Sequence, residues 1–398
     1  MNKKERILIF ILAGVNFTHI LDFMIMMPLN PQLSAHFHIN QFQFNLLVSS
    51  YAISAFASGI VAAFFVDGFD RKKVLLYGYI GFLAGTLCCA LAPTYHLLML
   101  ARIVAGLFGG VIGAQVLSIV GDTFSYDRRA TAMGYLTAAF SVASVFGVPM
   151  GLFLATKTNW HAPFLFVAAV GSVIAILIIR FIPSMTKHLE DGAKRKVSDA
   201  FMNVYENKNM QRALLLSIVL MIGHFSVIPT IAAYMVHNVG LTKEQLPYIY
   251  FCGGLATLVT SPLIGKVADK KGKFPVFAFF ALLCAVPVFF ITNLPPVQLG
   301  VALSITSVFF IFVSGRMIPM QAMIASVVTP QQRGGFMSIN SSFIQLGSGM
   351  AGIISGMIIS EDASGKIENY NYVGYLAIAI TIICVFIAKG LKPVQDTR

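Results

Sequence analysis

The sequence predicts an all-α integral membrane protein whose twelve transmembrane helices form two pseudo-symmetric six-helix bundles. Composition is the first observation behind this prediction: of 398 residues, 57% are hydrophobic and only 11% are charged, and the mean hydropathy is +0.79. Soluble domains carry about 25% charged residues, so the composition excludes a soluble globular enzyme, a disordered chain and a nucleic-acid binder. The other two observations are twelve apolar runs of spanning length and a loop motif that occurs in both halves.

Each apolar run approaches the length of a bilayer-spanning helix, which needs ~20 residues at a rise of 1.5 Å. The ten-residue alternation typical of outer-membrane β-strands does not accompany them. The basic residues before the first run resemble those of a signal peptide, but this run is too long, contains Asp22 and lacks a small-residue cleavage site, so we interpret it as the first helix. The predicted spans are Ile7–Pro28, Phe44–Val66, Val74–Ala92, Leu97–Val120, Thr131–Leu154, Ala162–Ile182, Ala213–Met235, Leu246–Val267, Phe274–Thr292, Val297–Val328, Phe336–Ile359 and Tyr372–Leu391.

The basic residues predict the orientation of these helices. An even number of spans places both ends of the chain on one side of the membrane. Of the 28 Lys and Arg residues, 23 fall at the two ends and in the loops after even-numbered helices, whereas the opposite face holds Lys157, Lys243 and Lys366. The positive-inside rule then places both termini in the cytoplasm, as in a multi-pass protein of the inner membrane. The net charge of +12 therefore describes orientation and indicates no acidic partner.

The longest polar stretch divides the chain into two halves. We expect an N-terminal six-helix bundle over residues 1–182, a cytoplasmic linker over 183–211 and a C-terminal six-helix bundle over 212–398. The basic residues of the linker obey the topology rule, and we favour that explanation over a site for anionic lipid headgroups.

The two halves repeat a polar motif at the same place. Asp67 and Arg71 follow the second helix, and Gly265, Asp269 and Lys273 occur in the corresponding stretch around the end of the eighth. Asp67 and Asp269 are 202 residues apart, which is about half of the chain. Two parallel six-helix repeats with a site at their interface are typical of a class of secondary transporters.

Motifs inside the spans agree with this repeat. The fourth helix carries Leu100, Arg102 and Gly106 in the pattern L-x-R-x-x-x-G, and the fifth carries Gly147-Val-Pro149-Met-Gly151. Together with the loop motifs, these patterns resemble the major facilitator superfamily over essentially the whole chain. The resemblance implies the major facilitator fold, with the fifth-helix element similar to that of proton-coupled exporters.

Residues of the tenth helix indicate which branch of the superfamily the sequence resembles. Gly315, Arg316 and Pro319, followed by Arg333, are similar to the twelve-helix drug:proton antiporter branch and to the sugar-efflux-like permeases near it.

The resemblance also implies a set of gating residues. It places Asp67 near the amino end of the eleventh helix and pairs Arg71 with Asp122, contacts that hold the cytoplasmic side closed. Asp70 stands where the family has glycine. The second motif copy is expected to act in the same way, and three residues of the fifth helix are expected to let it bend. The full gating set is Asp67, Arg71, Asp122, Gly265, Asp269, Lys273, Gly147, Pro149 and Gly151.

Ionisable residues inside the spans are the candidates for proton coupling. Among 16 acids only Asp22 lies deep in a span, and His19 shares its helix face at i, i+3. Asp22 lies roughly 9 Å and Arg102 roughly 8 Å from the periplasmic ends of their helices, so we predict that they form an ion pair. Burial raises the pKa of a carboxyl group towards neutrality, and a nearby cation lowers it again. A carboxyl group under both influences can bind and release a proton. A purely structural ion pair is the alternative, and a hydrogen-bonded core residue is the alternative for His19.

The second half supplies a parallel pair. His224 lies 202 residues after Asp22, and Arg316 lies at a similar depth, ~18–20 Å from the cytoplasmic ends of their helices. Arg316 is a candidate anchor for an anionic or carbonyl-bearing substrate, or a structural charge satisfied by backbone carbonyls. His224 is a candidate proton carrier, or a neutral buried hydrogen-bonding residue. The other candidate substrate-binding residues are Asn16, Gln115, Gln321, Asn340 and Gln345, which in the alternative hold helices together.

The sequence contains no nucleophile triad and no phosphate-binding loop, so we expect neither an enzyme nor ATP coupling. No cofactor is expected, and His36 with His38 is a weak metal candidate. We expect a monomeric, proton-coupled secondary active transporter in the lipid bilayer that exports a small organic solute or drug by alternating access. The alternatives are a proton-coupled importer of a small metabolite and a lipid flippase.

Overall fold

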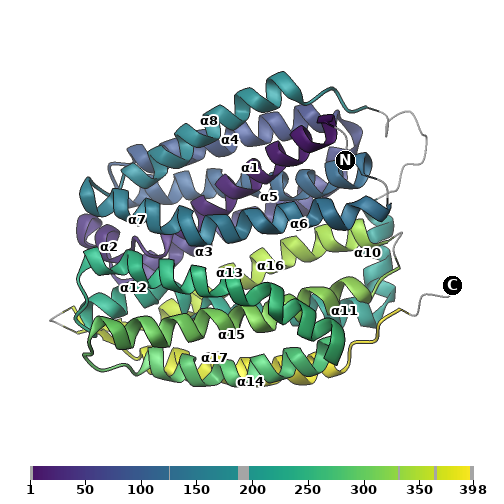
Figure 1. The fold of residues 1–398 in the computed structure, drawn as a ribbon. Helices are drawn as coiled ribbons and strands as arrows, with labels where there is room; N and C mark the ends of the chain where they lie inside the picture. Colours follow the sequence, from purple (N-terminus) through teal and green to yellow (C-terminus); the bar gives the residue numbers. More distant parts are fainter. Residues whose placement is uncertain (1–2, 125, 187–196, 330–331, 363–364, 395–398) are drawn as a thin grey trace.

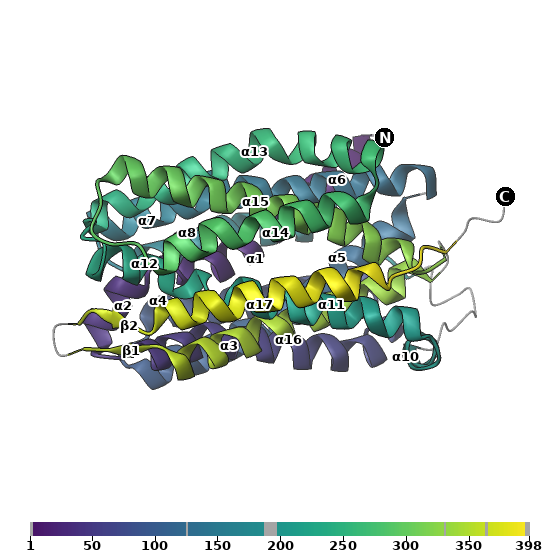
Figure 2. The same ribbon diagram turned by 90° about the horizontal axis from the view of Figure 1, so that it is seen from below.

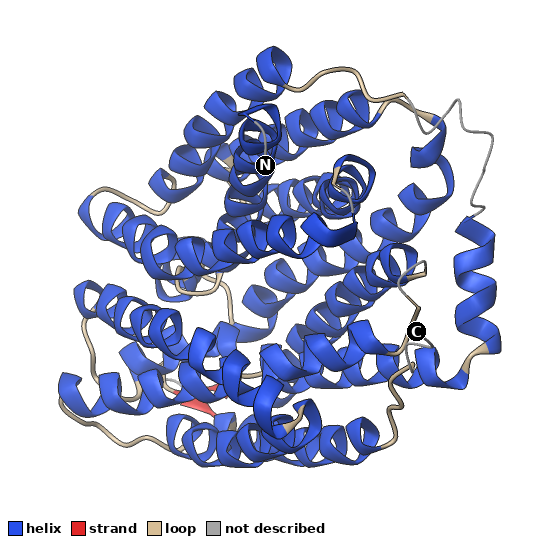
Figure 3. Ribbon diagram, turned by 45° about the vertical axis from the view of Figure 1, so that its right-hand side comes forward, coloured by secondary structure: helices blue, strands red, loops and turns tan. Residues whose placement is uncertain are grey.

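The computed structural model describes the whole chain except residues 1–2, 125, 187–196, 330–331, 363–364 and 395–398. Within the described residues, twelve helical segments are long and apolar enough to cross a membrane. The prediction of an all-α, twelve-helix membrane protein is therefore confirmed. Two short strands are the described exceptions to the helical architecture (Figure 3).

The first half of the chain forms six spans in the order of the sequence. Its elements are α1 (Lys3–Met26), α2 (Asn30–Phe37), α3 (Gln41–Phe65), η1 (Val66–Gly68), α4 (Arg71–Leu91), α5 (Tyr95–Thr123), α6 (Tyr126–Val142), the π-helical η2 (Ala143–Gly147), α7 (Val148–Lys157) and α8 (Ala162–Phe181). The fifth span is the continuous run of α6, η2 and α7.

The second half repeats this plan. Its elements are α10 (Val197–Glu206), α11 (Lys208–Phe225), α12 (Ile228–His237), η3 (Lys243–Gln245), α13 (Leu246–Lys271), α14 (Lys273–Thr292), α15 (Leu299–Ser326), α16 (Arg333–Ile358), β1 (Ser360–Glu361), β2 (Ile367–Glu368) and α17 (Tyr370–Lys389). The two strands pair antiparallel.

The two halves lie side by side, with the first half in the upper part of Figure 1 and the second half in the lower part. The start of α1 and the end of α17 lie at one end of the molecule together with α10 (Figures 1 and 2). The β1–β2 hairpin, α2 and α12 lie at the other. We call these the α10 end and the hairpin end. The positive-inside rule predicts that the α10 end faces the cytoplasm.

Two spans depart from regular α-helical geometry inside stretches that the sequence predicts as single helices. The seventh span breaks between α11 and α12, because Pro229 at the start of α12 lacks the backbone N–H that a continuous helix needs. The fifth span contains five π-helical residues directly before Val148 and Pro149, for the same reason. In addition, α11 begins at Lys208, five residues before the predicted Ala213 and inside the predicted linker.

Apolar packing distinguishes the two ends of the molecule. At the hairpin end one continuous cluster joins both halves, with Ile25 and Leu29 from the first and Ile231 and Tyr370 from the second. At the α10 end each half has a separate cluster, around Ile112 in the first half and around Met320 in the second. The structure is therefore closed at the hairpin end by a core that both halves share.

Close contact between α3 and α5 depends on glycines. A Cβ at Gly106 would collide with the carbonyl of Tyr51 and the hydroxyl of Ser54, and a Cβ at Gly110 would collide with the carbonyl of Ala55. Small residues four apart let helix backbones approach in this way. The contact fixes Tyr51 relative to α5.

We expect Gly106→Ala to lower the melting temperature of the purified protein, because overpacking a tight helix contact costs roughly 1–3 kcal/mol. Gly113→Ala in the same helix is the matched control, since a Cβ there meets nothing within 4 Å. Thermal unfolding in neutral detergent measures both variants. Equal melting temperatures for the two variants would contradict the assignment of Gly106 to the α3–α5 contact.

Candidate functional site

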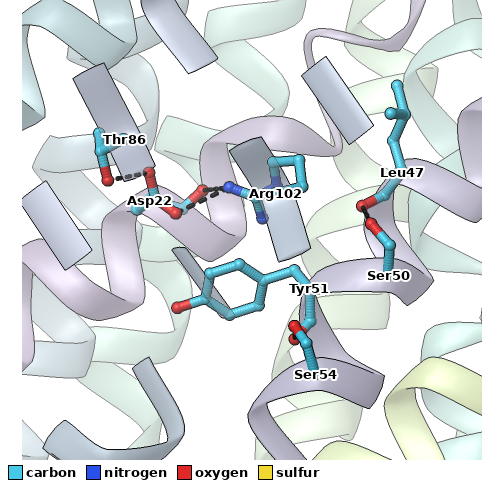
Figure 4. Close-up of polar contacts among 7 residues, drawn as sticks. All are labelled: Asp22, Leu47, Ser50, Tyr51, Ser54, Thr86 and Arg102. Carbon is cyan, nitrogen blue, oxygen red and sulfur yellow. Dashed lines mark hydrogen bonds and ion pairs between the residues drawn. The ribbon is translucent and has the colours of Figure 1, made fainter. Parts of the chain in front are cut away.

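A fully buried ion pair joins the first and fourth spans, as the depth of the two residues predicts. Nη1 of Arg102 on α5 donates a hydrogen bond to Oδ2 of Asp22 on α1 at 2.7 Å, and both side chains are 0% exposed (Figure 4). The third span completes the contact, because Oγ1 of Thr86 on α4 donates to Oδ1 of Asp22 at 3.0 Å. Both oxygens of the carboxylate are thus hydrogen-bonded, and three helices meet at it.

An aromatic ring supports the arginine from the second span. The guanidinium carbon of Arg102 lies 4.3 Å from the centre of the Tyr51 ring on α3, a cation–π contact (Figure 4). The ring of His19 lies 6.2 Å from that of Tyr51, centre to centre. Thr86 and Tyr51 could not be predicted from the sequence, because a threonine or a tyrosine in an apolar helix carries no distinguishing signal.

Several polar atoms around this pair have no hydrogen-bond partner among the described residues. They are Nε and Nη2 of Arg102, the hydroxyl of Tyr51 and Nε2 of His19. The last two converge, because a Cβ at Gly109 would lie 2.6 Å from the Tyr51 oxygen and 2.9 Å from Nε2 of His19. Buried polar atoms are nearly always hydrogen-bonded in proteins. The Tyr51 hydroxyl and the His19 ring pack directly against the backbone of Gly109, where no side chain would fit.

The second half contains a buried arginine that forms no ion pair with an acid among the described residues. Arg316 on α15 is 1% exposed and donates a hydrogen bond from Nη1 to Oγ1 of Thr381 on α17 at 2.8 Å. Its Nε has no partner among the described residues, and neither has Nδ1 of His224 on α11. The sequence left open whether Arg316 anchors a substrate or is a structural charge held by backbone carbonyls; the partner of its Nη1 is the side-chain hydroxyl of Thr381.

Two of the predicted substrate-binding amides are buried with unpartnered polar atoms. Gln115 on α5 is fully buried, and neither its Oε1 nor its Nε2 has a partner among the described residues. Asn340 on α16 accepts a hydrogen bond from Ser217 at 2.6 Å through Oδ1, whereas its Nδ2 has no described partner.

The other predicted amides lie in different surroundings. Asn16 on α1 donates to the carbonyl of Leu136 at 3.0 Å and so links two helices of the first half. Gln321 is exposed and Gln345 is partly buried.

The predicted ion pair of the loop motif is present. Nε of Arg71 donates to Oδ2 of Asp122 at 3.0 Å, which ties the start of α4 to the end of α5. The predicted contact of Asp67 lies outside the described side chains. Asp70, which stands in place of a glycine, accepts hydrogen bonds from Lys72 N at 2.9 Å, Met185 N at 2.9 Å and the Ser184 hydroxyl at 2.6 Å.

These contacts give Asp70 a defined role. Desolvation raises the pKa of its carboxyl, but the hydrogen bonds from Ser184, Met185 and Lys72 outweigh that effect, and the pKa lies below its ordinary value. Asp70 therefore caps α4 and fastens the chain that follows α8 to it.

The gating candidates of the second motif copy lie in α13 and at the start of α14. In the second motif copy, Asp269 is exposed and a Cβ at Gly265 would meet nothing within 4 Å. Lys273 begins α14 directly after Gly272, whose φ of +93° favours glycine.

The fifth span packs on the first through its glycines. Pro149 lies at the start of α7, directly after η2. A Cβ at Gly147 would lie 2.9 Å from Leu21, and one at Gly151 would lie 2.5 Å from Ile25. Both contacts flank Asp22, so this span is in position to follow any movement of α1.

Polar contacts cross between the halves at the hairpin end. The side-chain amides of Asn30 and Gln41 hydrogen-bond to each other, and Nδ2 of Asn30 also donates to the carbonyl of Pro229 at 3.0 Å. The backbone N–H of Gln41 donates to Oε1 of Glu361 at 3.1 Å. Asn30 is fully buried, so this network belongs to the shared core that closes this end.

His36 and His38, the weak metal candidate, belong to no group of metal-ligating side chains in the described part of the chain. The ring of His36 packs 5.4 Å from that of Trp160 and 6.3 Å from that of His161. No group of three or more His, Cys, Asp or Glu side chains with metal-binding geometry occurs among the described residues.

Comparison with known proteins places this geometry among transporters. The family model described as Major Facilitator Superfamily matches residues 12–315 and 213–397. Two relatives from Bacillus subtilis (strain 168) are the uncharacterized MFS-type transporter YceJ, 25% identical with 85% of each chain covered, and multidrug resistance protein 1, 23% identical with 96% of this chain and 97% of the relative covered.

Solved structures share the fold. A D-xylose–proton symporter covers 100% of both chains with a TM-score of 0.79 at 14% identity. A bacterial homologue of the human lysosomal transporter Spinster, in an inward-facing and occupied conformation, covers 100% of both chains with a TM-score of 0.77 at 15% identity.

We expect strong coupling between Asp22 and Arg102 in stability. Asp22→Asn and Arg102→Met should each destabilise the protein by roughly 3–5 kcal/mol, because each leaves one buried charge unpaired. The double variant should lose much less than the sum of the two. Thermal unfolding measures the cycle, with Arg180→Met at the exposed end of α8 as the control. Additive effects would show that the pair does not act as a unit.

Asn30→Ala should loosen the hairpin end. The substitution leaves Gln41 and the carbonyl of Pro229 without a partner, a penalty of roughly 1–3 kcal/mol. Hydrogen–deuterium exchange of the α12 amides should accelerate. Asn293→Ala is the matched control at the same end, because the hydrogen bonds of Asn293 to Phe289, Thr292 and Tyr375 stay within the second half and do not cross between the halves. Unchanged exchange in α12 would contradict the role of Asn30 in closure.

Proposed function

Because the chain belongs to the major facilitator superfamily, we propose that it is a proton-coupled secondary active transporter that exports a small organic solute or drug by alternating access. The family assignment and the twelve membrane-spanning helices support transport of a small molecule. Proton coupling, the direction and the substrate are our proposals. The single observation that carries proton coupling is the buried pair of Asp22 and Arg102.

In this proposal Asp22 is the proton carrier. Among the acids whose burial the structure describes it is the one that is fully buried, and an ionised carboxylate at this depth depends on the guanidinium of Arg102 for compensation. A proton that binds one carboxylate oxygen removes the negative charge and with it the attraction to the arginine. The pair thus has two electrostatic states. In one, Asp22 is ionised and paired with Arg102; in the other, Asp22 is protonated and Arg102 is released. His19, which lies one turn before Asp22 on α1, is the proposed residue through which the proton reaches the carboxylate, and His224 is a further candidate of the predicted set.

The position of the pair relates its charge to helix movement. Leu21 and Ile25, the neighbours of Asp22 in α1, belong to the core shared by both halves, whereas Tyr51 belongs to the core of the first half alone. A change in the pair therefore acts at the boundary between the closed end and the separate bundles. We propose that this coupling moves the chain between states closed at the hairpin end and states closed at the α10 end.

The gating residues act in the second of these states. In the proposed cycle, the Arg71–Asp122 pair and the second motif copy hold the α10 end when it is closed, and Gly147, Pro149 and Gly151 let the fifth span bend. The relative named multidrug resistance protein 1 supports export rather than import. Gln115 and Asn340 are the proposed substrate-binding residues with the best support, because their unpartnered buried atoms call for a ligand or water. A monomer in the inner membrane, with both termini cytoplasmic, completes the proposal.

Asp22→Asn should abolish uphill transport driven by a pH gradient and leave substrate exchange intact. The amide keeps the size of the carboxyl but cannot carry a proton. The assay uses proteoliposomes with an imposed pH gradient and, as probe, whichever compound of a panel of cationic, neutral and anionic fluorescent dyes the wild type moves. Glu368→Gln, in the hairpin, is the matched control.

Three outcomes would overturn parts of this proposal. Gradient-driven accumulation that survives in Asp22→Asn excludes Asp22 as the proton carrier. Protons and dye that move in the same direction in the wild type exclude an antiporter and indicate an importer. Transfer of headgroup-labelled lipid between leaflets would indicate a flippase.

A further inference from the structure

An aromatic contact joins the two halves directly beside the buried ion pair. Phe23 follows Asp22 in α1, and its ring lies 5.6 Å, centre to centre, from the ring of Phe225 on α11. The two ring planes are inclined at 60°, which is close to the edge-to-face arrangement that aromatic pairs prefer. Phe23 belongs to the first half and Phe225 to the second, so this contact crosses between the halves.

The ring of Tyr51 connects the arginine of the pair to the same phenylalanine. The guanidinium carbon of Arg102 lies 4.3 Å from the centre of the Tyr51 ring, and this ring lies 5.5 Å from that of Phe23, centre to centre. Phe23 is therefore linked to the ion pair twice, through the α1 backbone that it shares with Asp22 and through the ring of Tyr51. Side chains packed as densely as those of a protein interior transmit a displacement to their neighbours. A movement of the arginine or of α1 thus reaches Phe23.

The two phenylalanines lie where the apolar clusters of the molecule meet. Phe23 packs against the cluster that both halves share at the hairpin end and also against the separate cluster of the first half. Phe225 packs against the shared cluster and against the separate cluster of the second half. The halves are therefore joined on one side of this pair and separate on the other. A movement of the halves relative to each other changes the contact between the two rings.

Phe225 is also the last residue of α11, directly before the break in the seventh span. Side chains from other elements hold this break. The hydroxyl of Tyr370 on α17 donates to the carbonyl of Val227 at 2.8 Å, and Nδ2 of Asn30 on α2 donates to the carbonyl of Pro229 at 3.0 Å. Hinges in proteins are commonly a few residues at the end of an element. The break is thus a defined joint between α11 and α12, and the residue that contacts α1 lies at its edge.

We propose that Phe23 and Phe225 transmit the charge state of the ion pair to the joint between α11 and α12. Proton binding to Asp22 releases Arg102, which keeps its own charge. The arginine and the ring of Tyr51 then move relative to Phe23, Phe225 follows, and the joint changes its conformation. Phe23 is a positioning residue in this scheme, because it acts through its ring contacts and takes up no proton. The inference rests on the proposed role of Asp22 as the proton carrier and adds how the second half responds to it.

Hydrogen–deuterium exchange of the reconstituted full-length protein tests this coupling. Asp22→Asn mimics the neutral carboxyl group, and exchange is followed in the peptide that contains residues 226–232. We expect the substitution to accelerate exchange there by about fivefold or more, the lower end of typical coupling between two sites in a protein. Peptides of α14 are the reference, because a general loss of stability would accelerate exchange in both places.

Second-site variants assign the response to the aromatic contact. In a Phe23→Leu background, Asp22→Asn should leave the exchange of residues 226–232 unchanged relative to α14, because leucine has no ring to contact Tyr51 and Phe225. A Phe225→Leu background should have the same effect and keeps the test possible if one of the two variants fails to fold. Phe17→Leu is the matched control. Phe17 lies in the same helix and packs against the same shared cluster, and this background should retain the acceleration.

Two results would overturn the proposal. In the first, Asp22→Asn leaves the exchange of residues 226–232 unchanged relative to α14. In the second, the acceleration persists in a folded Phe23→Leu or Phe225→Leu background, so that the aromatic contact is not the route. The vesicle assay with Asp22→Asn measures proton-driven transport instead. A failure of the proposed proton carrier and a failure of this contact therefore give different results.

Discussion

One buried carboxylate paired with one buried guanidinium is the interaction on which the rest of the structure depends. Asp22 and Arg102 are both 0% exposed, and their 2.7 Å contact joins the first and fourth spans. Removing two charges from water is costly, and the mutual attraction repays this only when hydrogen bonds satisfy the remaining atoms. Thr86 donates a hydrogen bond to the carboxylate from the third span, and the ring of Tyr51 packs on the guanidinium from the second span. Nε and Nη2 of Arg102 have no hydrogen-bond partner among the described residues. Four helices of the first half are thereby organised around one charge pair.

The pair lies where the packing of the molecule changes. Towards the hairpin end, both halves share one apolar core and the hydrogen bond of Asn30 to Pro229, which together close that end. Towards the α10 end, each half has a core of its own. Interfaces of this kind are bistable rather than continuously deformable. A change of charge at the boundary can therefore favour one arrangement of the halves over the other.

The membrane spans and the buried charged residues could both be predicted from the sequence for the same physical reason. A polar segment or a charge in the hydrocarbon layer of a bilayer costs a large free energy. Apolar length defined twelve helices, and equal depth was sufficient to pair Asp22 with Arg102. The Arg71–Asp122 pair came from the family resemblance. Tyr51 was not predicted because the depth of a residue in the membrane does not show which neighbouring helix its side chain faces. The Asn30–Pro229 bond was missed because a backbone carbonyl has no sequence signal. The short α10 lies in a polar stretch, where propensity is a weak guide.

Infrared spectroscopy of the reconstituted protein tests most directly whether Asp22 exchanges a proton. The wild type and Asp22→Asn are titrated from alkaline to acidic buffer, and their difference isolates the carbonyl stretch of one protonated carboxyl group from those of the other 15 acids. Proton binding at Asp22 predicts a protonated-carboxyl band in the wild type that is missing from Asp22→Asn. Identical spectra over the whole titration would contradict it, and the pair would then be a structural ion pair only.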